Sequence, residues 1–205
     1  MSVAVCIPSG NQVHVGFARC LANLTAMLTK MGIEFEVIFS LGSVLPQLRT
    51  DLAKAALSNG HDWVLWLDSD MHFPDTVFEQ LYKRQAKIVA ATYSTRTSPQ
   101  RSVAFNDLSN VEDRLASGTG LHVVDAVGMG CMLVHSSVYS KLPEPWYSHL
   151  WNEETKTFSG EDVYFCHIAK QHDIKVHVDL ELSKELAHYG TKAYLLQETQ
   201  DFTSV

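Results

Sequence analysis

The chain has 205 residues, with 16 lysines and arginines against 23 aspartates and glutamates, which gives a formal net charge of −7. A chain of this length is expected to form one domain that buries about 70% of the surface exposed by its unfolded form. The acidic balance argues against broad nucleic-acid binding, because that requires a basic surface that displaces counterions from phosphates. It is compatible with a site for one small anion.

The N-terminal ten residues lack the basic residues and the long apolar run of a signal peptide, and no stretch reaches the ~20 apolar residues of a membrane span. The four cysteines lie far apart in apolar surroundings without a CxxC pair, which favours core residues over a zinc site or a disulfide framework: Cys6, Cys20, Cys131 and Cys166. We therefore expect a cytoplasmic protein without a membrane span. Its oligomeric state is left open.

The first half of the chain alternates between strand and helix patterns. Short apolar runs with β-branched residues predict strands at 3–7, 34–40, 62–67 and 87–93, and apolar steps of three and four predict helices at 17–31, 45–59 and around 77–81. This order is typical of an α/β fold with a mostly parallel, Rossmann-like sheet, right-handed crossovers and flanking helices.

The second half begins with a polar, irregular stretch. Residues 94–119 are expected to form a surface loop, with a mobile lid as the alternative. Apolar runs then predict strands at 121–127, 129–134 and 174–179, with helices at 136–142 and 161–171. Without repeats or linkers, residues 1–205 are expected to be a single domain.

Two carboxylates follow the apolar run 63–67, in the sequence Asp68-Ser69-Asp70. Ligands of open α/β sheets collect at the carboxyl ends of strands, and two carboxylates one residue apart would repel each other unless a cation lay between them. Hard oxygen ligands suit Mg²⁺ or Mn²⁺, which can bridge to a diphosphate. The alternative is an ordinary turn, in which Asp and Ser are common.

Four other motifs have both a functional and a structural interpretation. Gly160-Glu161-Asp162 opens a predicted helix, where acidic residues also stabilise the helix dipole. His188 follows the last predicted strand, but it is one of ten histidines. Pro145-Trp146-Tyr147 could stack on a sugar or fill the core. Gly128-Met129-Gly130 fits close approach to a ligand or a simple bend.

Taken in this order, the motifs resemble those of nucleotide-sugar glycosyltransferases of the A-type fold, and in particular the inverting, family-2-like enzymes with DxD and ED motifs. The resemblance implies a nucleotide-binding half at about residues 1–93 and an acceptor and catalytic half at about 120–205. It implies Mn²⁺ or Mg²⁺ as cofactor and a nucleoside-diphosphate-sugar as donor, a UDP-sugar before a GDP-sugar. The partners would be this small-molecule nucleotide-sugar and a hydroxyl acceptor.

The resemblance also implies residue roles on the donor side. The divalent metal would be held by Asp70, with Asp68 contacting the ribose, the metal or both, and His188 completing the metal shell. Residues expected at the nucleotide are Pro8, Ser9, Arg49, Asp68, Ser69 and Asp70.

On the acceptor side, Asp162 corresponds to the catalytic base, with Glu161 beside it facing the acceptor. The expected borders of the sugar and acceptor sites are Gly128, Met129, Gly130 and Trp146. A carboxylate in this position would take the proton of the attacking hydroxyl.

Two other functions remain open at this level. A sugar-phosphate nucleotidyltransferase would share the layout and the metal, but the sequence has no Gly-rich, Lys- or Arg-containing phosphate loop after the first strand. A non-catalytic module that binds a nucleotide or sugar with the same fold is the alternative outside the enzymes.

Overall fold

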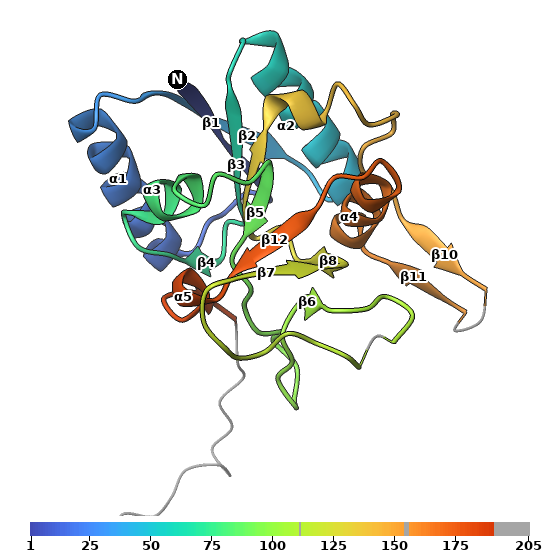
Figure 1. Ribbon diagram of the computed structural model, residues 1–205. Helices are drawn as coiled ribbons and strands as arrows, with labels where there is room; N and C mark the ends of the chain where they lie inside the picture. Colours follow the sequence, from blue (N-terminus) through green and yellow to red (C-terminus); the bar gives the residue numbers. More distant parts are fainter. Residues whose placement is uncertain (111, 154–155, 191–205) are drawn as a thin grey trace, which may run out of the picture.

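A seven-stranded sheet forms the centre of the protein in the computed structural model, which describes residues 1–190 except 111 and 154–155 (Figure 1). Its strands, in spatial order, are β2 (Glu34–Leu41), β1 (Ser2–Ser9), β3 (Trp63–Leu67), β9 (Cys131–His135), β5 (Ile88–Ala90), β12 (Val176–Asp179) and β7 (Leu121–Val124). The helices are α1 (Val15–Lys30), α2 (Leu45–Ser58), α3 (Val77–Tyr82), α4 (Glu161–Gln171) and α5 (Leu180–Ser183), with a 3₁₀ turn at Ser136–Val138.

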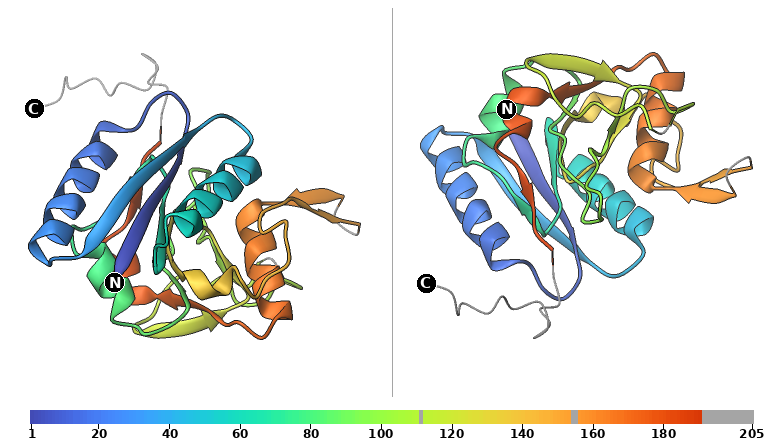
Figure 2. Two further views of the ribbon diagram at one scale, coloured as in Figure 1. Left: turned by 90° about the horizontal axis from the view of Figure 1, so that it is seen from above. Right: turned by 90° about the horizontal axis from the view of Figure 1, so that it is seen from below.

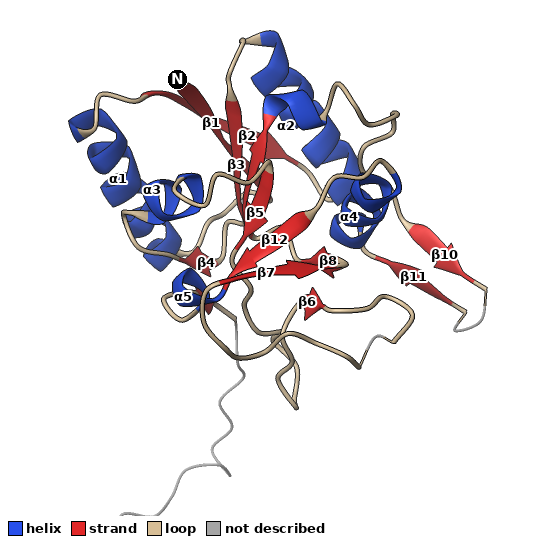
Figure 3. Cartoon of the chain, viewed as in Figure 1, coloured by secondary structure: helices blue, strands red, loops and turns tan. Residues whose placement is uncertain are grey.

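Three two-stranded sheets accompany the central one. They pair β10 (Leu150–Asn152) with β11 (Thr157–Ser159), β4 (Met71–His72) with β13 (Ala187–His188), and β6 (Ala104–Phe105) with β8 (Ala126–Val127). Figure 3 labels most of their strands: β4, β6, β8, β10 and β11. The pair β4–β13 matters for the site because it joins the end of the described chain to the turn that follows β3.

The central sheet is mostly parallel, with five of its seven strands running in one direction. The exception at the centre is β9, which lies antiparallel between β3 and β5 and pairs Trp63 with His135 and Leu67 with Cys131. The predicted order of four successive parallel strands did not include this insertion. Residues 131–134 are completely buried, so they fill a position between two strands that are themselves covered on both faces.

The insertion interleaves the expected nucleotide-binding half and the expected acceptor half within one sheet. It also brings the start of β9 to the edge at which β3 ends, where the Asp68 N–H donates to the Gly130 carbonyl at 3.1 Å.

Helices cover both faces of the sheet, and Figure 2 shows α1 on one side with α2 and α4 on the other. The alternation along β1 explains the two layers: Val3, Val5 and Ile7 pack with the α1 and α3 side, whereas Ala4 and Cys6 pack with the α2 and α4 side. The expectation for the cysteines is confirmed, because all four are free and buried.

Most helices begin and end near their predicted positions, and α4 spans 161–171 as expected. The helix expected at 136–142 is instead a short 3₁₀ turn, continued by single i to i+3 bonds from the Tyr139 N–H to Ser136 and from the Lys141 N–H to Val138. Residues 94–119 are largely irregular, as expected. Within the described ranges, no helix combines the length and the apolar character needed to cross a membrane.

Candidate functional site

The motifs singled out in the sequence meet at the edge of the sheet where β1, β3 and β5 end. Ser9 closes β1, Asp68 follows β3, and Gly130 precedes β9 at the same edge. The first turn of α4 adds Glu161 and Asp162 from the α2 side. Sites at the carboxyl ends of strands are the general location of ligands in open α/β sheets.

Asp70 and His188 are brought together by the pairing of β4 with β13, which sets His188 opposite Met71. The His188 Nε2 atom lies 3.5 Å from Asp70 Oδ2, and the Tyr189 N–H donates to the Asp70 carbonyl at 2.8 Å. The other ring nitrogen of His188, Nδ1, donates to the Ser94 carbonyl at 3.1 Å. This bond fixes the ring and directs Nε2 at the Asp70 carboxylate.

The pair is electrostatically coupled to a second cation, because Arg96 Nη1 donates to Asp70 Oδ2 at 2.7 Å. Burial opposes ionisation of Asp70, but the hydrogen bond and charge of His188 and the charge of Arg96 outweigh it and lower the pKa of Asp70. The hydrogen bond to Asp70 in turn raises the pKa of His188 against the effect of burial.

The donor set of this pair fits a hard divalent cation. A carboxylate oxygen and an imidazole nitrogen lie 3.5 Å apart, and the Nδ1–H bond to a carbonyl leaves Nε2 as the ring nitrogen available to a metal. The part of the chain that the structure describes contains no group of three or more His, Cys, Asp or Glu residues placed for a metal ion. Mg²⁺ and Mn²⁺ are commonly held by one or two protein ligands together with substrate phosphates, so two donors fit this mode.

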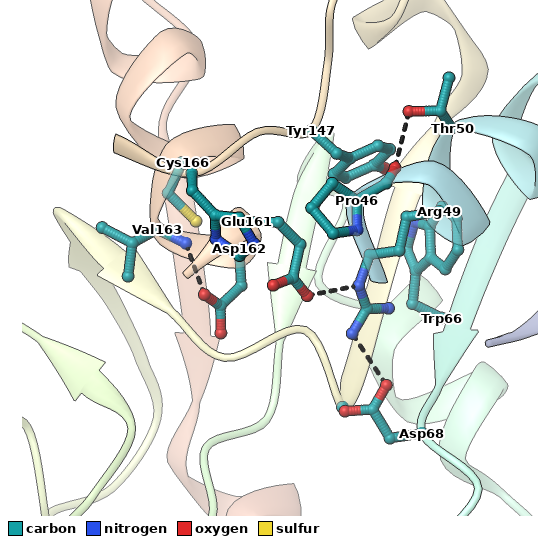
Figure 4. A network of polar contacts seen from close by, with 12 residues as sticks. Pro46, Arg49, Thr50, Trp66, Asp68, Tyr147, Glu161, Asp162, Val163 and Cys166 are labelled. Carbon is teal, nitrogen blue, oxygen red and sulfur yellow. Dashed lines mark hydrogen bonds and ion pairs between the residues drawn. The ribbon is translucent and has the colours of Figure 1, made fainter. Parts of the chain in front are cut away.

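Asp68 lies apart from that pair and is bound by Arg49. The guanidinium of Arg49 donates from Nη2 to Asp68 Oδ1 at 2.8 Å and from Nε to Glu161 Oε1 at 2.9 Å (Figure 4). Arg49 is only 1% exposed and Glu161 only 6%, and the guanidinium carbon lies 5.4 Å from the centre of the Trp66 ring.

This buried position differs from two expectations. The expectation was that Arg49 approaches the nucleotide and that Glu161 faces the acceptor. In the structure the two side chains form an ion pair with each other in the interior. The physical reason is that the buried carboxylate of Glu161, close to the partly buried carboxylate of Asp68, needs a cation, and an arginine on the inner face of α2 supplies it.

Asp162 is the third carboxylate of this group. Among the described residues, no basic side chain forms an ion pair with it. It is half-buried in the first turn of α4, and its Oδ1 accepts the Val163 N–H at 2.8 Å. Burial, followed by the charge of Glu161, raises the pKa of Asp162 to about 6. The preceding Gly160 leaves it space, because a Cβ at that position would stand 2.5 Å from Asp162 Oδ1.

Tyr93 is a central residue that the sequence reasoning missed. Its hydroxyl accepts the Gly130 N–H at 3.0 Å, and its ring packs edge-on against His188 with 5.1 Å between ring centres. A Cβ at either Gly128 or Gly130 would stand 2.6 Å from the Tyr93 oxygen. The two glycines thus make room for Tyr93, and the available signal was its place at the end of a predicted strand.

The remaining predicted residues fall into two groups. Pro8 and Ser9 end β1 at the expected edge, and the Ser69 carbonyl accepts the His14 N–H at 3.1 Å, next to the start of α1. Trp146 and Met129 are core residues, with exposures of 7% and 0%. Trp146 donates from its indole nitrogen to the Leu142 carbonyl, so it does not present a face to an acceptor as expected.

A cavity of about 410 Å³ lies beside this group and shares Tyr93 and Ser94 with it. Polar residues that line it include Thr92, Ser102 and Ser183, and apolar ones include Leu180 and Leu186.

Comparison with known proteins gives structural matches and no sequence matches. No protein-family model matches the chain, and neither does any curated protein sequence. The solved structure of A197 from STIV aligns with a TM-score of 0.62 at 15% identity, over 98% of this chain and 100% of A197.

Two glycosyltransferases are among the other similar structures. S. aureus TarS 1–349 aligns with a TM-score of 0.53 at 13% identity, over 92% of this chain and 60% of that one. A mutant Drosophila β1,4-galactosyltransferase 7, in complex with manganese, UDP-Gal and xylobiose, aligns with a TM-score of 0.51 at 11% identity, over 100% of this chain and 82% of that one. At these identities the likeness shows the fold alone: the chain has the fold of the A-type glycosyltransferases.

Proposed function

We propose that this protein is a metal-dependent glycosyltransferase that moves a sugar from a nucleoside-diphosphate-sugar to a hydroxyl acceptor with inversion. The observation that carries the proposal is the meeting of two chemically different groups at one sheet edge. One is the Asp70–His188 pair, which suits a divalent cation, and the other is Asp162, a carboxylate with a pKa of about 6. The fold shared with glycosyltransferases supports the same class of reaction.

The donor would be bound on the side of Asp70 and His188. Mn²⁺ or Mg²⁺ held by these residues would neutralise the charge of the departing nucleoside diphosphate. The neighbouring Arg96 guanidinium is half-exposed and adjoins the same carboxylate, so it is available to the diphosphate when it leaves Asp70. Asp68 keeps its role at the ribose side in this proposal, through the oxygen that Arg49 does not bind.

A UDP-sugar is the first candidate donor, since a galactosyltransferase of the same fold was solved with UDP-Gal and manganese. A GDP-sugar is the second.

Asp162 would act as the general base. At neutral pH a carboxyl group with a pKa of about 6 is mostly ionised, and it is basic enough to accept a proton from a hydroxyl as the bond to the sugar forms. The Val163 N–H holds one of its oxygens, which leaves the other for the acceptor. Glu161 is the anchor of the pair, because Arg49 binds its carboxylate in the interior.

The test is a thermal-shift and transfer series with UDP, GDP and their sugars in the presence and absence of Mn²⁺. A nucleotide at 100 times its Kd stabilises the folded protein by about 2.7 kcal/mol. We expect Asp70→Ala to lose the Mn²⁺-dependent part of this stabilisation, and Asp162→Asn to keep it but to lose transfer to an added acceptor. Stabilisation by nucleotide that is unchanged in Asp70→Ala contradicts the metal assignment. Unchanged transfer by Asp162→Asn contradicts the base assignment.

A further inference from the structure

The interior of the site contains a cation that links its two acidic motifs. Arg49 lies on α2, whereas Asp68 follows β3 and Glu161 opens α4, so the three charges come from three different elements. Separate nitrogens of one guanidinium bind the two carboxylates, and Figure 4 shows the guanidinium between them. These two bonds therefore fix the start of α4 relative to the turn after β3.

This two-pronged arrangement, the fork, has Nε bound to Glu161 and Nη2 bound to Asp68, and it requires an arginine. Its planar group presents nitrogens in two directions at once, while the single ammonium group of a lysine binds as a point charge. The remaining nitrogen, Nη1, is buried and has no hydrogen-bond partner among the described residues. The orientation of the group is thus set by the two carboxylates and by the Trp66 ring beneath it, and not by a full set of hydrogen bonds.

We propose that Arg49 is a positioning residue for Asp162, which it holds in place by binding Glu161 on one side and Asp68 on the other. The proposal rests on the base role proposed above for Asp162. It gives Glu161 the role of an anchor, since its carboxylate is bound by the guanidinium, and it extends the reaction machinery to a side chain that is only 1% exposed.

The charges around Asp162 supply an independent measurement of this link. Several titratable or charged groups face it: Glu161 and Cys166 on α4, Arg49 on α2, Asp68 after β3 and Tyr93 after β5. After burial, the charges of Glu161 and Asp68 raise the pKa of Asp162 and that of Arg49 lowers it. Loss of the cation, or of the fixed geometry around it, therefore changes how Asp162 titrates.

The experiment follows the Asp162 carboxyl carbon by NMR in the protein labelled with ¹³C-aspartate, with the signal assigned by Asp162→Asn. We expect Glu161→Gln to lower the pKa of Asp162 and Arg49→Met to raise it, with the double variant between the two. Arg49→Lys keeps the positive charge but not the fork. It should therefore shift the pKa of Asp162 from its wild-type value and restore UDP-sugar transfer only partly relative to Arg49→Met. Should Arg49→Met fail to fold, Glu161→Gln and Arg49→Lys still decide the question.

Arg84→Met is the matched control, because Arg84 also binds a buried aspartate with two nitrogens but lies on the α5 side of the fold. It should destabilise the protein and leave the Asp162 titration unchanged. An Asp162 pKa that is the same in wild type, Glu161→Gln and Arg49→Lys overturns the positioning role, whatever the transfer activity. The expected pKa shifts in a protein that transfers no sugar support the link between the charges and overturn the proposed function instead.

Discussion

The ion pair between Arg84 and Asp179 gives a stability prediction that needs no substrate. Arg84 Nε donates to Asp179 Oδ2 at 2.7 Å and Nη2 to Oδ1 at 2.9 Å. The two side chains are unequally buried, since that of Arg84 is 32% exposed and that of Asp179 is 0% exposed. Asp179 also caps α5, because its Oδ1 accepts the N–H groups of Glu181 and Leu182. The two possible single substitutions therefore differ in what they leave behind.

Arg84→Met leaves a buried carboxylate without its cation. Removal of one partner of a buried ion pair costs about 3–5 kcal/mol. The two N–H groups of α5 still bind the Asp179 carboxylate, so we expect the lower end, about 3 kcal/mol. Asp179→Asn leaves an arginine that can turn to water and an amide oxygen that still caps the helix, so about 1–2 kcal/mol is expected.

Urea unfolding at neutral pH measures both losses. In thermal unfolding of a chain of 205 residues, the same loss of about 3 kcal/mol corresponds to a decrease in Tm of about 6–12 °C. The m-value of the urea transition should not change, because the surface exposed on unfolding stays the same. A loss of unfolding free energy in Arg84→Met that is equal to or smaller than that in Asp179→Asn would show that the buried carboxylate does not depend on this cation.

Three further predictions concern the site. Gly130→Ala places a Cβ 2.6 Å from the Tyr93 oxygen and should cost about 1–3 kcal/mol in urea unfolding, part of which Tyr93→Phe restores. In the presence of a chelator, His188→Gln should lose more unfolding free energy at about pH 6 than at about pH 9. The hydrogen bond to Asp70 raises the pKa of His188, so the stability that this bond contributes is present at low pH and disappears as the pH rises through the raised pKa. Arg96→Ala removes a competing cation from Asp70, so Mn²⁺ should bind up to about fivefold more tightly by calorimetry.

The Arg96 prediction has a matched control, and each of the three has an outcome that would contradict it. Arg101→Ala changes an arginine of the same loop that pairs with Glu112 and not with Asp70, so it should leave Mn²⁺ affinity unchanged. Weaker Mn²⁺ binding by Arg96→Ala would argue against competition at Asp70. A loss for His188→Gln that grows with pH would contradict the expected direction of the pH dependence, and a Gly130→Ala protein as stable as wild type would show that Tyr93 has room to move.

Periodicity in the sequence was enough to predict the elements of the first half and α4, because each buries one regular stripe or a continuous apolar run. It did not predict the antiparallel place of β9, since a fully buried strand has the same composition in either direction. The burial of Arg49 was also missed, because an arginine in a helix pattern is ordinarily exposed and its two partners are 19 and 112 residues away.

The position of the Asp68-Ser69-Asp70 turn at this end of the sheet was predicted correctly, because polar residues directly after a buried apolar strand lie where the strand leaves the core. What the pattern could not show is that its two carboxylates have different partners, Arg49 for Asp68 and His188 with Arg96 for Asp70. These partners come from α2, from the loop after β5 and from β13, which only the folded chain brings together.

The central place of β9 also has a consequence for the order in which the chain can fold. During synthesis β3 and β5 are complete before residues 131–135 exist, so β3 then has one unpaired edge, and β5 lacks both of its neighbours, β9 and β12. A fragment of residues 1–93 would leave these edges open, which favours pairing with other chains over a stable folded unit. Closure of the sheet depends on contacts across about 70 residues of sequence, and such non-local pairing slows folding. The strand that brings Gly130 to this end of the sheet thus also joins the two halves of the chain within one sheet.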